Sequence, residues 1–263
     1  MVSNMESCDL VIILYSCYTI DKYRQQMITI NQTWGKKCQD YPTRIRLLYF
    51  LGEEQREDPE FQDTTVTKYI HLPGVQDDYL SASYKQWLGM KYVYDHYRPK
   101  FIHCMGTDTY MNVPKMLRFL EIFDPNQTLF IGGHGDTREV IRGKPCYFHS
   151  GGPGFVITHK VLELLSPVLP QITEAWMHLC KEHHIDHLLP ACDVAISYYL
   201  QQPNTPVHVL KADDEFINCN YLGWPCHMGQ INLHKLLVCH LMDDASCHTF
   251  TGLLEANNYF VTL

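Results

Sequence analysis

Basic residues, long apolar runs and regular cysteine motifs are scarce in this sequence, and each scarcity argues against a class of protein. The 263 residues include 21 Lys and Arg against 29 Asp and Glu, which gives a formal charge of −8. Because proteins bind nucleic acid backbones through basic patches, this balance argues against nucleic acid as a partner. A polybasic patch that would bind an anionic membrane surface is also missing.

No apolar run approaches the roughly 20 residues that span a bilayer, so membrane insertion of this chain is not expected. The first predicted strand begins close to Asp9, which leaves no room for a signal peptide. The 11 cysteines are odd in number and lack CxxC pairs or zinc spacing. They predict reduced thiols packed as small apolar groups, and with them a soluble, cytoplasmic protein.

Strand and helix patterns alternate along a chain with 46% apolar and 19% charged residues, typical of one globular domain. Predicted strands are Leu10–Ser16, Arg44–Leu51, Val66–His71, Phe101–Met105, Leu129–Gly132 and Phe155–Thr158. Predicted helices are Asp21–Gly35, Leu80–Tyr94, Val113–Phe123, His159–Leu169, Ile172–His184 and Pro190–Leu200. This alternation predicts an α/β fold with a parallel or mostly parallel sheet between helices. After Pro203, short apolar pieces and aromatic residues alternate with polar turns, and the order of strands and helices there is not predicted.

The segment Phe101–Val113, FIHCMGTDTYMNV, is the centre of the pattern. Its apolar strand breaks at Gly106 and then presents one carboxylate, Asp108, between two threonines. Open α/β sheets hold ligands, and often metal-bound phosphates, at the carboxyl ends of their strands. A second interpretation is that Asp108 forms an Asx-type turn that merely ends the strand.

Two further segments carry candidate chemistry. Glycines in Ser150–Gly154 precede an apolar strand and permit a ligand to approach the backbone closely. They do not form a Walker phosphate loop, because no Gly-Lys-Ser/Thr follows. Asp193 lies near the start of a predicted helix, where it could act as a base or only interact favourably with the helix dipole.

Five short motifs occur in one order between Leu10 and Leu200. They are Arg24 with Thr33-Trp34-Gly35, Asp78-Tyr79 with Lys85, Gly106-Thr107-Asp108-Thr109-Tyr110, Ser150-Gly151-Gly152-Pro153-Gly154-Phe155-Val156, and Cys192-Asp193-Val194. Together they resemble the fringe-like β1,3-glycosyltransferases, which are inverting enzymes. Where that family usually has three consecutive acids before Thr-Tyr, this chain has Gly106, Thr107 and a single acid, Asp108.

The resemblance implies a single-domain type A glycosyltransferase over residues 1–263, with a Rossmann-like, mostly parallel mixed sheet and helices on both faces. Residues from about 8 to 132 would bind the nucleotide and residues from about 133 to 263 the acceptor. The implied reaction moves a hexose or N-acetylhexosamine from a UDP-sugar to a hydroxyl of a glycan or protein, with inversion and a β1,3-type linkage. Relatives are mostly tethered Golgi proteins, so the Golgi lumen is the expected location if an N-terminal anchor has been removed.

The same resemblance implies roles for individual residues. Asp193 would be the general base, and Asp108 with His240 would bind Mn²⁺ or Mg²⁺ beside the diphosphate. His208 and His227 are alternatives to His240. The remaining candidates would contact the donor: Asp78, Lys85 and Thr107 at the nucleotide, and Gly151, Gly152 and Gly154 at the sugar.

The missing acids leave two other interpretations open. A chain with Gly106 and Thr107 in place of acids could be a non-catalytic sugar- or nucleotide-binding module derived from such an enzyme. A metal-dependent phosphoesterase or nucleotidyltransferase would need more clustered acids near Asp108 than the sequence has.

Overall fold

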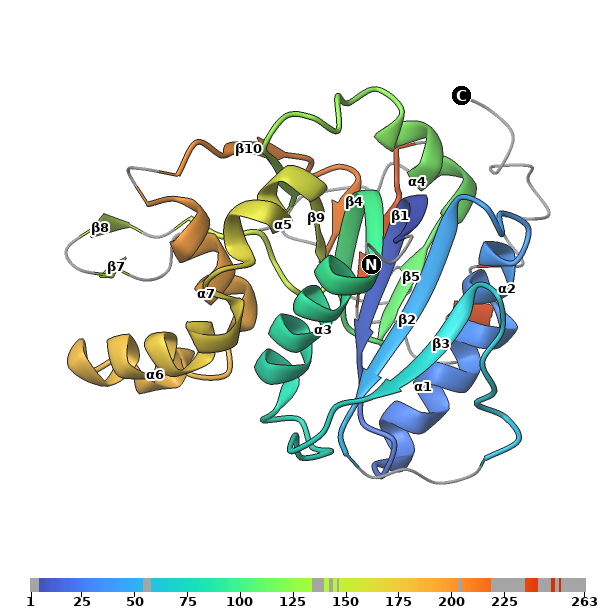
Figure 1. Cartoon of the computed structure of the whole chain (residues 1–263), viewed down its shortest axis with the longest axis horizontal. Helices are drawn as coiled ribbons and strands as arrows, with labels where there is room; N and C mark the ends of the chain where they lie inside the picture. Colours follow the sequence, from blue (N-terminus) through green and yellow to red (C-terminus); the bar gives the residue numbers. More distant parts are fainter. Residues whose placement is uncertain are drawn as a thin grey trace.

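A seven-stranded sheet forms the middle of the computed structural model (Figure 1). The structure describes residues 5–53, 58–133, 140–141, 144–145, 147–202, 205–218, 235–240, 247–248 and 251. In spatial order the strands are β10 (His208–Lys211), β6 (Leu129–Gly132), β9 (Phe155–Thr158), β4 (Tyr97–Met105), β1 (Glu6–Tyr15), β2 (Ile45–Leu51) and β3 (Thr67–His71). Only β9 runs antiparallel to its neighbours in this sheet.

Helices cover both faces of this sheet. One face packs against α1 (Asp21–Gln32), α2 (Trp34–Cys38) and α4 (Val113–Leu120). The other packs against α3 (Ala82–His96), α5 (His159–Leu165), α6 (Ile172–Glu182) and α7 (Cys192–Leu200), with the short 3-10 helices η1 (Leu169–Gln171) and η2 (Asp186–Leu188). The predicted fold class, a mostly parallel mixed sheet between helices, is therefore confirmed.

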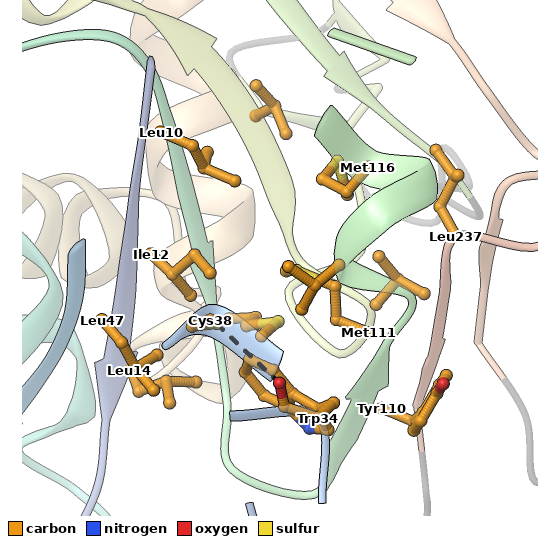
Figure 2. Packing of buried hydrophobic residues seen from close by; sticks show 14 of the residues in the cluster. Leu10, Ile12, Leu14, Trp34, Cys38, Leu47, Tyr110, Met111, Met116 and Leu237 are labelled. Carbon is orange, nitrogen blue, oxygen red and sulfur yellow. Dashed lines mark hydrogen bonds between the residues drawn. The ribbon is translucent and has the colours of Figure 1, made fainter. Parts of the chain in front are cut away.

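The alternation of side chains along β1 explains the two layers. Leu10, Ile12 and Leu14 face the cluster that includes Trp34 and Met116, as Figure 2 shows. Val11 and Ile13 face the opposite cluster, and all five β1 residues are 0% exposed. A strand buried on both faces has a continuous apolar run, which is why the sequence predicts a strand in this segment.

A second, three-stranded sheet lies beside the first. It pairs β5 (Thr109–Met111) antiparallel with β12 (Val238–His240), which pairs in turn with β11 (Phe216–Ile217). The register places His240 opposite Thr109, the residue after Asp108. The short hairpin β7 (Val140–Ile141) and β8 (Lys144–Pro145) completes the described strands.

Several predicted boundaries were wrong. The helix predicted over Asp21–Gly35 is divided at Thr33, whose φ of −112° and ψ of −115° leave the helical region, so Gly35 lies inside α2 instead of ending a helix. The helix predicted to reach Phe123 ends at Leu120, and β5 was not predicted at all. A three-residue strand is too short to produce a period of its own.

The described cysteines are buried and lie outside disulfides, as their irregular spacing predicts. Within the described residues, no helix has the length and apolar character needed to cross a bilayer.

Two glycines with positive φ provide a matched test of packing beside the sheet. Gly154 has φ +79°, and a Cβ there would lie 2.4 Å from the Cys104 carbonyl oxygen, whereas Gly74 has φ +73° and open space around it. We expect Gly74→Ala to lower the free energy of unfolding by about 1 kcal/mol through backbone strain alone. Gly154→Ala should cost about 1–3 kcal/mol more because of the clash. Urea denaturation compares the two variants, and equal losses would contradict this packing.

Candidate active site

A cavity of about 610 Å³ opens where β1 and β4 end. Parallel neighbours end at the same edge of a sheet, so Tyr15 at the end of β1 lies next to the Gly106–Asp108 segment that follows β4. Gly151 and Gly152, which precede β9, form another part of the wall. The start of α7, including Asp193, and the end of β12, at His240, complete it.

Asp108 and His240 are in contact with each other on the wall of this cavity. His240 Nε2 lies 3.3 Å from Asp108 Oδ1, and its Nδ1 lies 2.6 Å from Asn218 Oδ1. Burial alone would raise the pKa of Asp108, but the hydrogen bond and charge of His240 lower it below its ordinary value. The carboxylate is therefore ionised at neutral pH, the state in which it binds cations.

These two side chains fit a divalent cation that also binds a phosphate ligand. The described residues contain no cluster of three or more His, Cys, Asp or Glu side chains, so Asp108 and His240 form a partial donor set. Mg²⁺ in nucleotide sites typically binds one or two carboxylates and completes its shell with phosphate oxygens and water. Carboxylate oxygens also suit Mn²⁺. The arrangement matches an ion that is held jointly by protein and diphosphate.

Gly152 allows His240 to reach this position. A Cβ on Gly152 would lie 2.2 Å from His240 Nδ1, so a larger residue would displace the imidazole. The Gly152 carbonyl accepts a 2.9 Å hydrogen bond from Thr109 Oγ1, which ties the glycine segment to β5. Gly152 thus supports the candidate metal site through its lack of a side chain.

Asp193 lies in the first turn of α7, held by two backbone donors. Gly151 N–H donates to its Oδ2 at 2.8 Å, and Val194 N–H donates to its Oδ1 at 2.9 Å. Burial nevertheless raises the pKa of Asp193 above its ordinary value, although both hydrogen bonds and the charge of His240 act in the opposite direction. A carboxylate with a raised pKa is a stronger base than a solvated one.

A buried ion pair shapes the other end of the cavity. Lys85 is 1% exposed, and its Nζ lies 3.1 Å from Asp77 Oδ1 and donates a 2.7 Å hydrogen bond to the Ser16 carbonyl. Asp77 also accepts hydrogen bonds from the backbone N–H groups of Thr19 and Gly52. Burial alone would raise the pKa of Asp77, but these donors and the Lys85 charge lower it overall.

Two predicted nucleotide contacts already have partners within the protein. Asp78 accepts a 2.8 Å hydrogen bond from Ser81 N–H, so it caps the turn that precedes α3. Thr107 donates a 2.7 Å hydrogen bond to Gln26 and is 5% exposed. Their contact with a nucleotide stays a prediction.

The structure gathers most of the predicted site residues. Those that line the cavity are Asp78, Lys85, Thr107, Asp108, Gly151, Gly152, Asp193 and His240. Gly154 is the exception, because it packs against the carbonyl of Cys104 and leaves the cavity wall to Gly151 and Gly152. Of the alternatives to His240, His208 lies on β10 away from this wall, and His227 lies outside the described residues.

Sequence reasoning gave no site role to Asp77, Tyr15 or Tyr23, and it named Tyr79 only as part of a motif. Asp77 adjoins Asp78, and only the loop geometry selects it as the partner of Lys85. Tyr23 and Tyr79 line the cavity with nearly parallel rings whose centroids are 6.4 Å apart. A polar aromatic residue at the end of an apolar first strand, such as Tyr15, was the one available signal.

Comparison with known proteins now identifies the family. The profile of the Galactosyltransferase family matches residues 25–178. The chain belongs to this family. Membership confirms the predicted enzyme class, a glycosyltransferase, and is consistent with the fringe-like resemblance of the motifs.

Two curated relatives of this galactosyltransferase-family chain carry the name chondroitin sulfate synthase 3. The mouse protein is 28% identical over 159 residues and the human protein 33% identical over 159 residues. Each alignment covers 57% of this chain but 17% of the relative, so the chain spans only a small part of their length.

A solved structure shares the fold of the galactosyltransferase-family chain. It is a glycosyltransferase involved in the glycosylation of the major capsid of PBCV-1, and it aligns with a TM-score of 0.51 at 13% identity. The alignment covers 93% of this chain and 99% of that one. At this identity the likeness concerns the fold.

The Asp77–Lys85 pair leads to a stability prediction with a control on the same helix. Lys85→Met should lower the free energy of unfolding by about 3–5 kcal/mol, because it leaves the Asp77 carboxylate buried without its cation. Lys91 of α3 pairs with Asp95 at the surface, where its side chain is 35% exposed, so Lys91→Met should cost less than about 1 kcal/mol. Chemical denaturation at neutral pH measures both, and similar losses would refute the structural role of Lys85.

Proposed function

We propose that this chain is a metal-dependent, inverting glycosyltransferase. It moves a hexose or N-acetylhexosamine from a UDP-sugar to an acceptor hydroxyl, and forms a β1,3-type linkage. The observation that supports the proposal most directly is that one cavity is lined both by a half-buried carboxylate, Asp193, and by a carboxylate–imidazole pair, Asp108 and His240. The Asp193 carboxylate suits proton removal, and the Asp108–His240 pair suits a cation that is bound to phosphate.

At the diphosphate, Asp108 and His240 would hold Mn²⁺ or Mg²⁺. Such an ion, when bound, neutralises the negative charge that develops on the departing UDP. Asp108 would contribute a full negative charge, because its pKa lies below the ordinary value for aspartate. Asn218 orients the imidazole from the other side through its contact with Nδ1.

At the acceptor, Asp193 would remove the proton of the attacking hydroxyl. The acceptor oxygen forms a bond to the anomeric carbon from one face while the bond from that carbon to the diphosphate oxygen breaks on the other. One displacement of this kind inverts the anomeric centre. The proton passes to the Asp193 carboxylate, whose orientation is fixed by Gly151 N–H and Val194 N–H.

At the nucleotide, Tyr23 and Tyr79 offer aromatic faces at the mouth of the cavity. Tyr79 is 62% exposed, an unusual state for a large aromatic side chain and one that a stacked uracil ring would relieve. Lys22 also lines the cavity, and its positive charge acts on Asp108. This end of the cavity therefore suits the uracil ring and the diphosphate of UDP.

The acceptor is proposed to be a glycan. The relatives are named chondroitin sulfate synthase 3, which describes proteins that synthesise a glycan. Because the chain covers only 17% of each relative, the name supports a glycan acceptor without specifying its sugars.

A second candidate function is a sugar- or nucleotide-binding module without catalysis. It is favoured by Gly106 and Thr107, which leave Asp108 as the sole acid of its segment. Turnover separates the two functions, since a module binds UDP-sugars but neither transfers nor hydrolyses them.

Asp193→Asn tests the base. Hydrolysis of UDP-glucose, UDP-galactose and their N-acetylhexosamine counterparts is measured with Mn²⁺, and the active donor is then used for both proteins. Asparagine still offers an oxygen to Gly151 N–H, so UDP binding should persist while turnover falls about 10²–10⁴-fold.

The pH profile adds a second readout. The base works in its ionised form, so wild-type kcat/KM should fall as pH drops through the pKa of Asp193, which burial places above the ordinary value of about 3.9. The acid limb should be absent from the residual rate of Asp193→Asn. Unchanged turnover in the variant would refute the base, and UDP-sugar binding without any wild-type turnover would favour the module.

A further inference from the structure

Tyr15 occupies a part of the cavity wall that none of the assigned roles uses. It is the last residue of β1, half-buried, and lies beside the Gly106–Asp108 segment because Leu14 pairs with Met105 in the neighbouring strand. Its hydroxyl is directed toward the glycine segment, where it donates to the Gly151 carbonyl at 3.5 Å. The side chain therefore lies between the elements that carry the two candidate functional centres.

The electrostatic surroundings of the phenol place it near both centres. Burial raises the pKa of Tyr15 well above its ordinary value, and the charges of Asp193 and Asp108 add to the effect, together with two neighbouring thiols. The hydroxyl is thus protonated at any working pH and acts as a hydrogen-bond donor.

The hydroxyl has two acceptors in the protein, the Gly151 carbonyl and the Cys192 sulfur, and both are weak. O–H···O hydrogen bonds are usually about 2.7–2.8 Å long, and a 3.5 Å contact is weak. A ligand hydroxyl at normal distance would bind this proton better than the Gly151 carbonyl does. Exchange of a long bond for a short one is a direct gain in ligand affinity.

The proposed reaction specifies which part of the ligand lies here. In a single displacement the anomeric carbon must lie between the diphosphate, near Asp108, and the acceptor hydroxyl, at Asp193. The transferred sugar ring therefore occupies the space between these two carboxylates. Tyr15 lines that same space.

We propose that Tyr15 is a donor-sugar recognition residue, whose hydroxyl hydrogen-bonds a hydroxyl of the transferred sugar. This inference rests on the proposed function, since it assumes a sugar nucleotide in the cavity. It assigns Tyr15 to the sugar and leaves the nucleotide to Tyr23 and Tyr79. The hydroxyl contributes to binding and orientation of the donor and takes no part in proton transfer to Asp193.

Titration calorimetry of Tyr15→Phe tests the assignment. The probes, in the presence of Mn²⁺, are UDP and the four sugar nucleotides UDP-glucose, UDP-galactose, UDP-N-acetylglucosamine and UDP-N-acetylgalactosamine. For the sugar nucleotide that the wild type binds most tightly, Tyr15→Phe should raise the Kd about 5- to 10-fold, because one hydrogen bond is lost. The Kd of UDP, which lacks the sugar, should change by less than about twofold.

Tyr84→Phe is the matched control. The Tyr84 hydroxyl contacts the Met177 sulfur at 3.8 Å and lies outside the cavity. In Tyr84→Phe the Kd of UDP and the Kd of the sugar nucleotide should therefore match those of the wild type. Equal weakening of UDP and sugar nucleotide in Tyr15→Phe, or no weakening of either, would overturn the assignment. So would a wild type that binds UDP but none of the four sugar nucleotides. A wild type that binds neither UDP nor any sugar nucleotide would instead overturn the proposed function itself.

Discussion

The backbone of Gly151 and Gly152 is the constraint on which the candidate active site depends. Gly151 N–H fixes the Asp193 carboxylate at 2.8 Å, and the absent side chain of Gly152 makes room for the His240 imidazole. A Cβ at Gly151 would also lie 3.0 Å from the Asp193 Cβ. One segment of main chain therefore sets the positions of the proposed base and a proposed metal ligand at the same time.

Charge burial divides the cavity into two ends with different chemistry. At one end Lys85 pairs with Asp77 and holds the loop before α3 in place, and its contact with a nucleotide stays a prediction. At the other end the half-buried Asp193 has no ion pair among the described residues, and its raised pKa gives the proton affinity that a base requires. Desolvation makes the Asp77–Lys85 ion pair costly to break, and the same effect raises the proton affinity of Asp193.

The sequence allowed the sheet, its helical layers and most of the cavity wall to be predicted, because β1 and β4 are apolar runs and the motifs follow them directly. Asp108 was predictable as a cavity residue because it follows a strand, whereas Asp193 was predictable only through the resemblance of its motif to the fringe-like family. The partners were not predictable: the choice of Asp77 over Asp78 by Lys85 depends on loop geometry, and the approach of His240 depends on the short β5–β12 pairing. Gly154 was assigned to the sugar, although its positive φ serves packing against Cys104.

Whether Asp108 and His240 suffice to hold the ion is the question that decides the account. Thermal unfolding with saturating UDP and Mn²⁺ answers it most directly. Ligand at about 100 times its Kd adds about 2.7 kcal/mol, so the Tm of the wild type should rise by about 5 °C. Asp108→Ala should abolish the Mn²⁺-dependent part of this rise, whereas Asp95→Ala, a surface substitution on α3, should retain it. No rise in the wild type, or an equal rise in Asp108→Ala, would contradict the account.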